Sequence, residues 1–310
     1  MNPVVSESTV SEVRSVLSTD TLKELNLRST PKGLIQLASH LLILGISGYV
    51  WGINLGQNWV IALPALVIYG FGLAAMFAPL HECSHRTVFE SNTLNDVVCW
   101  SAGVLSLYNS AFFRRYHKWH HRYAQDLDKD PELSDLVPQT FQEYLITISG
   151  LPWWWGKLKT HTRVALGQLD SYPFIPESAH AEVIRSTRSQ LAVYAIAVMI
   201  SIAAHQPWFV MYWLFPLFVG QPILRFILLA EHTGCSHDRN PFTNTRSTIT
   251  VFPLQFLMWN TAFHAEHHLY PSIPFYQLPQ AHQQIKQHLV HVDPGYVKVN
   301  RDILSNLSSV

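Results

Sequence analysis

Charged residues are scarce in this chain of 310 residues. Asp, Glu, Lys and Arg together make up 14% of it, whereas a soluble globular domain carries roughly 25%. The 21 basic residues balance the 21 acidic ones, so the formal net charge is zero. The low charge argues against an ordinary soluble domain. The absence of a basic excess argues against a partner such as nucleic acid, whose phosphates need cations.

Cysteine is also rare. The three cysteines are Cys83, Cys99 and Cys235, and no two of them form a CxxC pair. This count excludes a disulfide framework and a thiolate zinc site. We therefore expect the chemistry of the protein to face a reducing compartment.

Two windows, residues 33–81 and 189–224, contain no charged residue at all. A membrane-spanning helix needs about 20 apolar residues, so each window has room for two. We predict spans at about 34–53, 59–80, 190–204 and 208–230, the last of which includes Arg225. The alternative is a soluble protein with four buried helices, but such helices would lack the charged outer face that water requires.

The basic residues predict the orientation of these spans. All Lys and Arg residues lie outside 33–85 and 189–224, so the tips of the two predicted hairpins carry none. Because Lys and Arg stay on the cytoplasmic side, both termini and the segments 81–188 and 231–310 are expected there. The first 32 residues lack the pattern of a signal peptide. The predicted fold is an all-α integral membrane protein, one domain over 1–310, with two hairpins and a cytoplasmic helical cap.

Three further segments are apolar but are not predicted to span. Residues 97–113 and 247–265 contain polar side chains that make lipid exposure unfavourable, and Pro253 interrupts any long helix in the second. They fit interfacial or re-entrant pieces better. Residues 153–155 are three tryptophans followed by Lys157 and Lys159. This pattern favours a helix on the lipid surface, and lining of a substrate path is the alternative.

Histidine is the residue in excess, with 17 copies. Eight of them form three tight groups, which are His81 and His85, then His117, His120 and His121, then His264, His267 and His268. On a helix, residues three and four apart share one face, so each group can aim at a metal. Imidazole suits iron, zinc, copper and nickel. Eight ligands exceed the four that one zinc takes, which predicts a site for two metal ions.

The predicted spans bring the three histidine groups to one side of the membrane, because two crossings separate the second group from the third. The remaining isolated histidines are expected to make hydrogen bonds rather than to bind metal. They are His40, His161, His180, His205, His282, His288 and His291.

The three histidine groups resemble the histidine boxes of the integral-membrane fatty acid desaturase superfamily, and the likeness extends over about residues 34–282, including the run 268–279. The resemblance implies a non-haem diiron centre that uses O2 and two electrons to oxidise an acyl chain. The eight box histidines would then be iron ligands. Family members often add one ligand after the fourth span, for which His232 is preferred to His237. No catalytic residue beyond the metal ligands is implied.

The activity that this resemblance implies is desaturation of a fatty acyl chain linked to a lipid or a thioester. A hydroxylase or ketolase acting on an apolar substrate is the alternative within the family. A zinc-dependent membrane hydrolase is the alternative of another class. No GxGxxG fingerprint and no haem-binding domain is present in the sequence, so the electrons are expected from a separate protein such as a ferredoxin.

Carboxylates near the boxes could orient the ligating histidines, because such rings donate their second N–H to a carboxylate or carbonyl group. The candidates are Glu82, Asp126, Asp128, Asp130, Glu231 and Glu266, although 126–132 could equally be a solvated loop. Asn260 is expected at a helix end. Arg114 and Arg115 are candidates for binding a phosphate or carboxylate head group, or they are anchors that set the topology.

Overall fold

The structure, a computed structural model, describes residues 16–134 and 137–307. Within these residues, four helical segments are long and apolar enough to cross a membrane: Thr30–Asn54, Trp59–Ser84, Glu177–Ala203 and Val210–His232. They confirm the prediction of an all-α integral membrane protein. The two chain ends, whose side of the membrane was predicted above, lie outside the described residues.

The helices extend beyond the apolar windows from which the spans were predicted. α3 covers Thr30–Asn54, and α4 (Trp59–Ala75) continues into α5 (Phe77–Ser84). α10 (Glu177–Ala203) begins well before residue 190. A π-helical turn, η2 (Val210–Leu214), leads into α11 (Phe215–His232). An apolar window marks the part of a helix that lipid can surround, whereas backbone hydrogen bonding continues into the charged residues beyond it.

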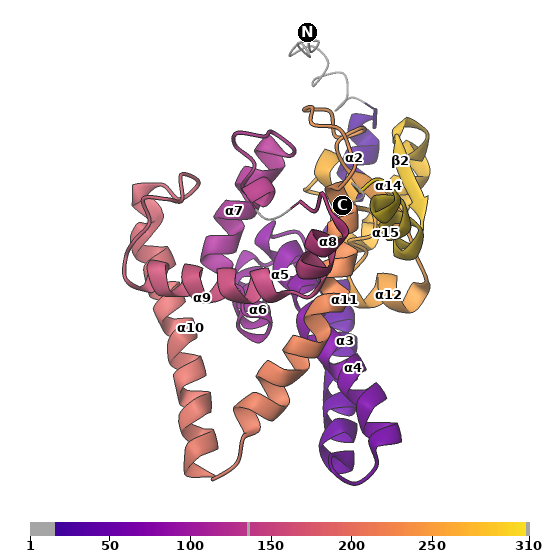
Figure 1. The fold of residues 1–310 in the computed structure, drawn as a ribbon. Coiled ribbons are helices and arrows are strands. Elements are labelled where there is room, and N and C mark those ends of the chain that lie inside the picture. The colour runs from indigo at the N-terminus through magenta and orange to yellow at the C-terminus, as the bar shows by residue number, and fades with distance from the viewer. Residues whose placement is uncertain (1–15, 135–136, 308–310) are drawn as a thin grey trace.

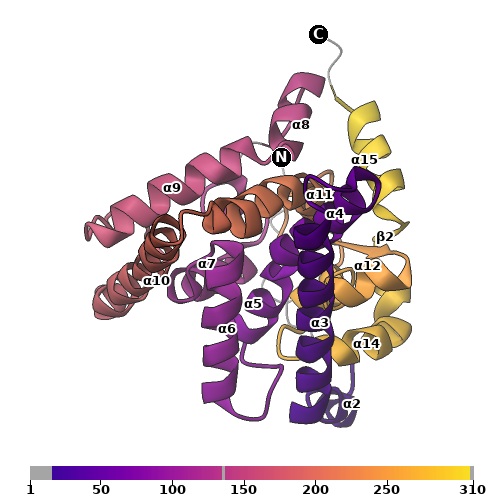
Figure 2. The ribbon, with the colours of Figure 1, turned by 90° about the horizontal axis from the view of Figure 1, so that it is seen from below.

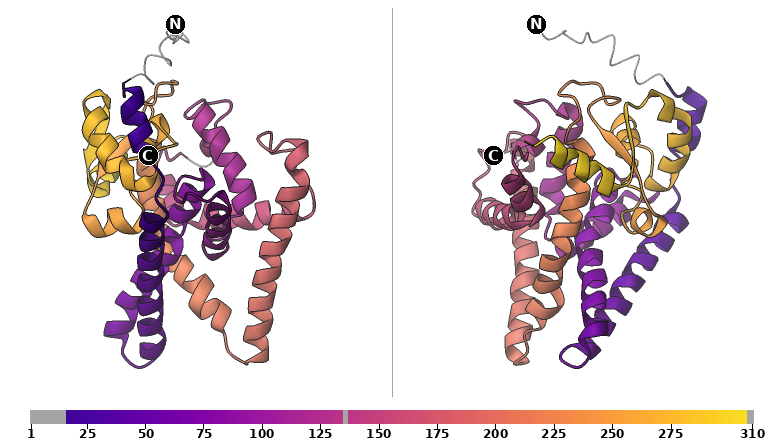
Figure 3. Two further views of the ribbon diagram at one scale, coloured as in Figure 1. Left: turned by 180° about the vertical axis from the view of Figure 1, so that it is seen from behind. Right: turned by 45° about the vertical axis from the view of Figure 1, so that its right-hand side comes forward.

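The four spans do not pack as two equal hairpins. α3 packs against α4, and α4 packs against α11. At Gly70 and Gly220 the backbones of α4 and α11 touch, so a Cβ at either position would overlap the other helix. Small residues permit this close approach in membranes. α10 meets α11 at the tip and then leans away from it, which leaves an open V (Figure 1 and the left view of Figure 3).

The segment 97–113 forms two helices at the end of the spans, and neither is long enough to cross a membrane. α6 (Asn92–Ser106) ends at Leu107, whose φ is 60°. α7 (Ser110–Tyr123) then begins with the side chain of Asn109 accepting a hydrogen bond from the backbone N–H of Phe112. Seen from below, α5, α6 and α7 lie on one side of α3, and α12 and α14 lie on the other (Figure 2).

α9 (Leu151–Ala165) runs crosswise to α10 near the same end of the spans (Figure 1). Its residues Leu151, Trp155 and Leu158 are exposed and recur at helical spacing, as on a helix that rests on lipid. Trp153 turns inward and donates a hydrogen bond from Nε1 to the hydroxyl of Tyr108 at 2.9 Å. The exposed Trp155 is compatible with a helix on the lipid surface, whereas Trp153 lines the large cavity described below.

A small parallel sheet departs from the all-helical expectation. β1 (Arg246–Ile249) pairs with β2 (His291–Pro294), with Arg246 opposite His291. Arg246 forms an ion pair with Asp293 at 3.0 Å and donates to the carbonyl oxygen of Thr233 at 2.9 Å. The sheet thereby connects the end of α11 to the C-terminal part of the chain. Because the two strands are far apart in the sequence, no local sequence pattern predicted their pairing.

The remaining elements are short and lie at the same end of the spans as the sheet. They are α2 (Thr19–Leu25), η1 (Pro131–Ser134), α8 (Phe141–Ile148), α12 (Phe252–Leu257), α13 (His264–Leu269), η3 (Phe275–Gln277), α14 (Leu278–Ile285), η4 (Lys286–His288) and α15 (Tyr296–Ser305). As Pro253 predicted, 247–265 contains no long helix. Asn260 lies in the turn after α12, with φ of 59° and its Nδ2 donating to the carbonyl oxygen of Phe275.

Candidate metal centre

Nine of the histidines gather in two buried groups. One contains His81, His85, His117, His121 and His267, and the other contains His120, His232, His264 and His268. Within each group, one potential ligand atom from every residue lies within 4.8 Å of all the others. The two groups are neighbours, since the ring centroids of His121 and His268 are 4.2 Å apart.

Helix geometry is compatible with the division of the boxes between the groups, and the packing of distant helices decides it. Consecutive residues on a helix point about 100° apart, while residues three and four apart share a face. His117 and His121 on α7 join one group, and His120 joins the other. The adjacent residues His267 and His268 on α13 divide in the same way, with His267 in the first group and His268 in the second. Each pair of adjacent histidines thus supplies one side chain to each group.

His232, the last residue of α11, belongs to the second group. Its Nδ1 donates to the carbonyl oxygen of Asn244 at 3.0 Å, and its Nε2 lies 3.1 Å from Nε2 of His264. The Asn244 contact places the proton on Nδ1 and leaves the Nε2 lone pair free to bind a metal. His237 is exposed and lies in neither group. This arrangement supports the choice of His232 over His237.

The donor set fits metal ions. Six of the grouped histidines have a buried ring nitrogen without a hydrogen-bond partner: Nε2 of His81 and His85, and Nδ1 of His117, His121, His264 and His267. An unsatisfied buried polar group costs about 1–3 kcal/mol. The Nε2 atoms converge within the groups: Nε2 of His121 lies 2.9 Å from Nε2 of His117 and 3.0 Å from Nε2 of His267. In the second group, Nε2 of His264 lies 3.1 Å from Nε2 of His232. Converging ring nitrogens suit a cation at the centre of each group, and imidazole is a good ligand for iron.

The ionisation of the rings is compatible with metal binding. Burial, together with repulsion from neighbouring rings, lowers the pKa well below its ordinary value in His85, His117, His121, His264, His267 and His268. These rings are neutral at pH 7, which is the form that coordinates metals. His120 differs: burial opposes its protonation, but the nearby Glu132 and Asp130 outweigh burial and raise its pKa.

Two of the candidate carboxylates orient grouped histidines. Asp130 is buried and accepts a hydrogen bond from Nδ1 of His120 at 2.9 Å, and Glu82 does the same for Nδ1 of His81 at 2.9 Å. Such outer partners hold a ligand ring in one orientation and one tautomer. Glu231 lies 3.6 Å from Nε2 of His264.

The other carboxylates have different surroundings. Asp126 faces Arg239 at 3.6 Å, and Asp128 is exposed, so these two belong to the solvated part of the loop. Glu266 is buried and accepts short hydrogen bonds from the hydroxyl of Ser247 and from Nδ1 of His282. It therefore connects α13 to β1 and α14 rather than orienting a grouped histidine.

None of the seven isolated histidines belongs to either group. His40 bridges α3 and α4, because its Nε2 donates to the carbonyl oxygen of Gly72 at 2.9 Å. His282 makes the buried contact with Glu266 that no local sequence pattern indicated. Replacing His282 would consequently disturb the packing of α13, which carries the third box.

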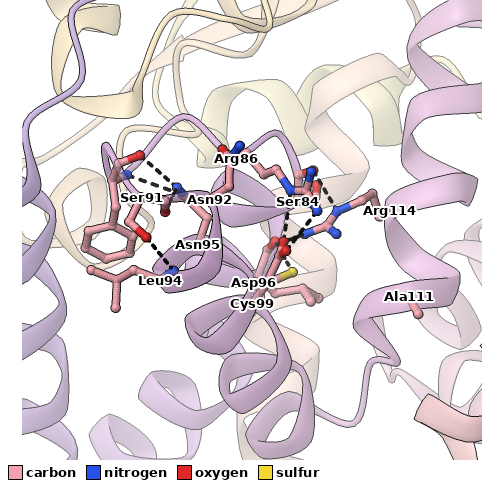
Figure 4. A network of polar contacts seen from close by, with 12 residues as sticks. Ser84, Arg86, Ser91, Asn92, Leu94, Asn95, Asp96, Cys99, Ala111 and Arg114 are labelled. Carbon is pink, nitrogen blue, oxygen red and sulfur yellow. Dashed lines mark hydrogen bonds and ion pairs between the residues drawn. The ribbon is translucent and has the colours of Figure 1, made fainter. Parts of the chain in front are cut away.

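Arg114 and Arg115 are engaged in ion pairs with other helices. Arg114 donates to the carbonyl oxygen of Ser84 at 3.1 Å and pairs with Asp96 at 2.5 Å, and Asp96 also pairs with Arg86 at 2.8 Å (Figure 4). Arg115 pairs with Glu182 on α10 at 2.6 Å. The head-group role predicted for the two arginines gains no support here, because neither lines the cavity beside the histidines.

A cavity of about 680 Å³ lies beside the second histidine group, with Glu231 and His232 in its wall. Its lining is rich in aromatic side chains from α5, α7, α9 and the turn before α7: Phe77, Tyr108, Phe112, Phe113, Tyr116 and Trp153. The volume is within the range of about 300–1,000 Å³ found for small-molecule sites. The cavity can therefore hold part of an apolar molecule next to a metal centre.

Acidification is expected to destabilise the metal-free protein. Six grouped histidines have a lowered pKa in the folded state, so below about pH 6.5 the unfolded chain binds more protons. The raised pKa of His120 opposes this trend. As far as the six histidines govern the balance, stability should fall as the pH drops from 6.5. Thermal unfolding of chelator-treated protein in detergent would measure this, and a melting temperature that rises on acidification would contradict it.

Comparison with known proteins is consistent with this geometry. A sequence profile described as fatty acid desaturase matches residues 57–300. The sn-1 oleoyl-lipid 12-desaturase of Picosynechococcus sp. is 26% identical over 248 residues, covering 74% of this chain and 70% of that protein. The fatty acid desaturase of Bacillus subtilis is 23% identical over 289 residues, covering 82% and 76%. The sphingolipid delta(4)-desaturase/C4-monooxygenase DES2 of Mus musculus is 23% identical over 283 residues, covering 87% and 77%.

Proposed function

The chain belongs to the fatty acid desaturase family of membrane oxidoreductases, and we propose that it desaturates an acyl chain with O2 at two histidine-bound iron ions. The observation that carries the proposal is the pair of histidine groups beside a cavity rich in aromatic side chains. In the balanced reaction, one O2, two electrons and two protons convert a CH2–CH2 unit into CH=CH and yield two waters.

The nine grouped histidines would hold the two ions, five in one group and four in the other. Iron bound there supplies the oxidising power to break an unactivated C–H bond. Asp130 and Glu82 keep the rings of His120 and His81 in their ligating orientation. The rings of His117 and His121 need no proton loss to bind, because burial already favours their neutral form.

The cavity would receive the acyl chain. Aromatic side chains such as Phe113 and Tyr116 present an apolar wall to it. A dry wall excludes water from the reacting carbon atoms and suppresses side reactions there.

Hydroxylation is the second candidate within the same site. The printed name of the mouse relative joins a desaturase and a monooxygenase activity. Both reactions begin with removal of one hydrogen from the chain and differ in the step that follows. The zinc hydrolase considered from the sequence does not agree with membership of an oxidoreductase family.

The electron donor and the orientation are part of the proposal. A separate carrier such as a ferredoxin would deliver the electrons, because the sequence has no dinucleotide-binding fingerprint. The histidine groups would face the cytoplasm, since the tips at the opposite ends of the spans lack Lys and Arg.

Lipid analysis of an expressing host tests the proposed reaction. The protein would be produced together with a ferredoxin and its reductase, and fed acyl substrates would be followed by mass spectrometry. We expect a product that has lost two hydrogens, whereas gain of one oxygen atom would indicate the hydroxylase. A His267→Ala variant in the same host is the matched control. If neither the desaturated nor the hydroxylated product formed while the reduced electron donor was present, the proposal would be refuted.

A further inference from the structure

Arg225 is a charged residue within a membrane-spanning helix. It lies in the span Val210–His232 and lines the cavity. Its Nη2 donates to the hydroxyl of Tyr108 at 3.0 Å, while its Nε is buried and has no hydrogen-bond partner. A charge at this depth is unfavourable and typically marks a functional site.

A second cation lies near Arg225. Lys157 of α9 places its Nζ 3.5 Å from the ring centre of Tyr108, the residue that Arg225 also contacts. Trp153 of α9 donates to the same hydroxyl. Both cations line the cavity. Helices α9 and α11, which are distant in sequence, thus bring two positive charges to one aromatic residue.

The carboxylates of the cavity wall lie mainly toward the histidines. Asp130 is hydrogen-bonded to His120, and Glu132 lies 3.5 Å from Nε2 of the same ring. Glu231 lies 3.6 Å from Nε2 of His264 and also interacts electrostatically with Arg225. Asp128 and a third lining cation, Lys129, belong to the exposed loop.

We propose that Arg225 and Lys157 bind an oxyanion, the carboxylate or phosphate of an anionic acyl substrate, at the end of the cavity away from the metal centre. The inference rests on the proposed function and names its substrate class. A guanidinium group binds either oxyanion through paired N–H donors, and Lys157 adds a point charge. Arg225 precedes His232 by two helical turns, about 10 Å, so several methylene groups separate the bound anion from the metal centre.

A purely structural role for Arg225, supporting Tyr108, makes a different prediction. Loss of that support would weaken the binding of charged and uncharged substrates alike. Loss of an anion site weakens only the binding of charged ones. Substrates that differ only in charge therefore separate the two roles.

The test measures binding of three probes to the iron-loaded protein in detergent: palmitate, dipalmitoyl phosphatidate and methyl palmitate. Arg225→Gln is expected to weaken binding of the preferred anionic probe by about 10- to 100-fold and to change binding of methyl palmitate by less than about 2-fold. Lys157→Gln should act in the same direction with a smaller effect. Lys159→Gln on the same helix is the matched control, because Lys159 is exposed and does not line the cavity.

Each outcome decides the proposal. Selective loss for palmitate identifies a carboxylate ligand, and selective loss for phosphatidate identifies a phosphate head group. Equal losses for all three probes, or none, would overturn the anion site. If Arg225→Gln does not fold, Lys157→Gln and Arg225→Lys answer the same question. Binding that depends on Arg225 without any oxidised product would remove the proposed reaction and leave the anion site standing.

Discussion

Replacing His120 or His267 with alanine is expected to abolish turnover and to reduce the iron bound by the purified protein. His267 belongs to the first group and His120 to the second, so under the proposed function each change would remove one ligand from a different ion. Loss of an outer partner of a ligand typically costs about 10–100-fold in metal affinity or activity, and loss of the ligand itself should exceed that. Iron analysis and product formation, measured on the same preparation, provide the readout.

The control for these variants is a histidine outside the site. His288 is exposed in η4 and belongs to neither group, so His288→Ala should retain iron and turnover. His282 is less suitable, because it contacts the buried Glu266 next to the third box. If His120→Ala kept about two irons per chain and full activity, the ligand set proposed here would be wrong.

Replacing His232 with alanine should have an effect as large as loss of a box histidine, although His232 lies outside the three boxes. Its ring completes the second group, with Nε2 3.1 Å from Nε2 of His264. That group has four members, so the variant retains three. We expect turnover to fall by more than about 100-fold and iron to fall to about one per chain.

His237→Ala is the matched comparison, since His237 lies five residues away and is exposed. It should bind two irons and retain most of its activity. The reverse result, with His237 essential and His232 dispensable, would show that His232 is not a ligand in the second group. Similar effects of both variants would point to a local folding defect, which circular dichroism and the melting temperature would reveal.

The amino-acid sequence by itself determined the membrane character and the eight box histidines. Charge-free windows such as 33–81 specify spans locally, because each apolar helix must satisfy its own backbone hydrogen bonds in lipid. The spacing of His81 and His85 indicates a shared face for the same local reason. The four spanning helices and the family profile over 57–300 confirm the membrane character and the family, and the eight box histidines all lie within the two groups.

Only the tertiary structure decided which histidines lie together in one group and which cations line the cavity. His120 and His121 are adjacent in sequence yet belong to different groups, and His232 joins them from a distant helix. Arg114 was singled out by its position before a box, but its charge is paired with Asp96. Arg225 and Lys157 line the cavity instead. Helical periodicity specifies directions within one helix, whereas ion pairs, cavities and shared ligand sets depend on how distant helices pack, which no local pattern encodes.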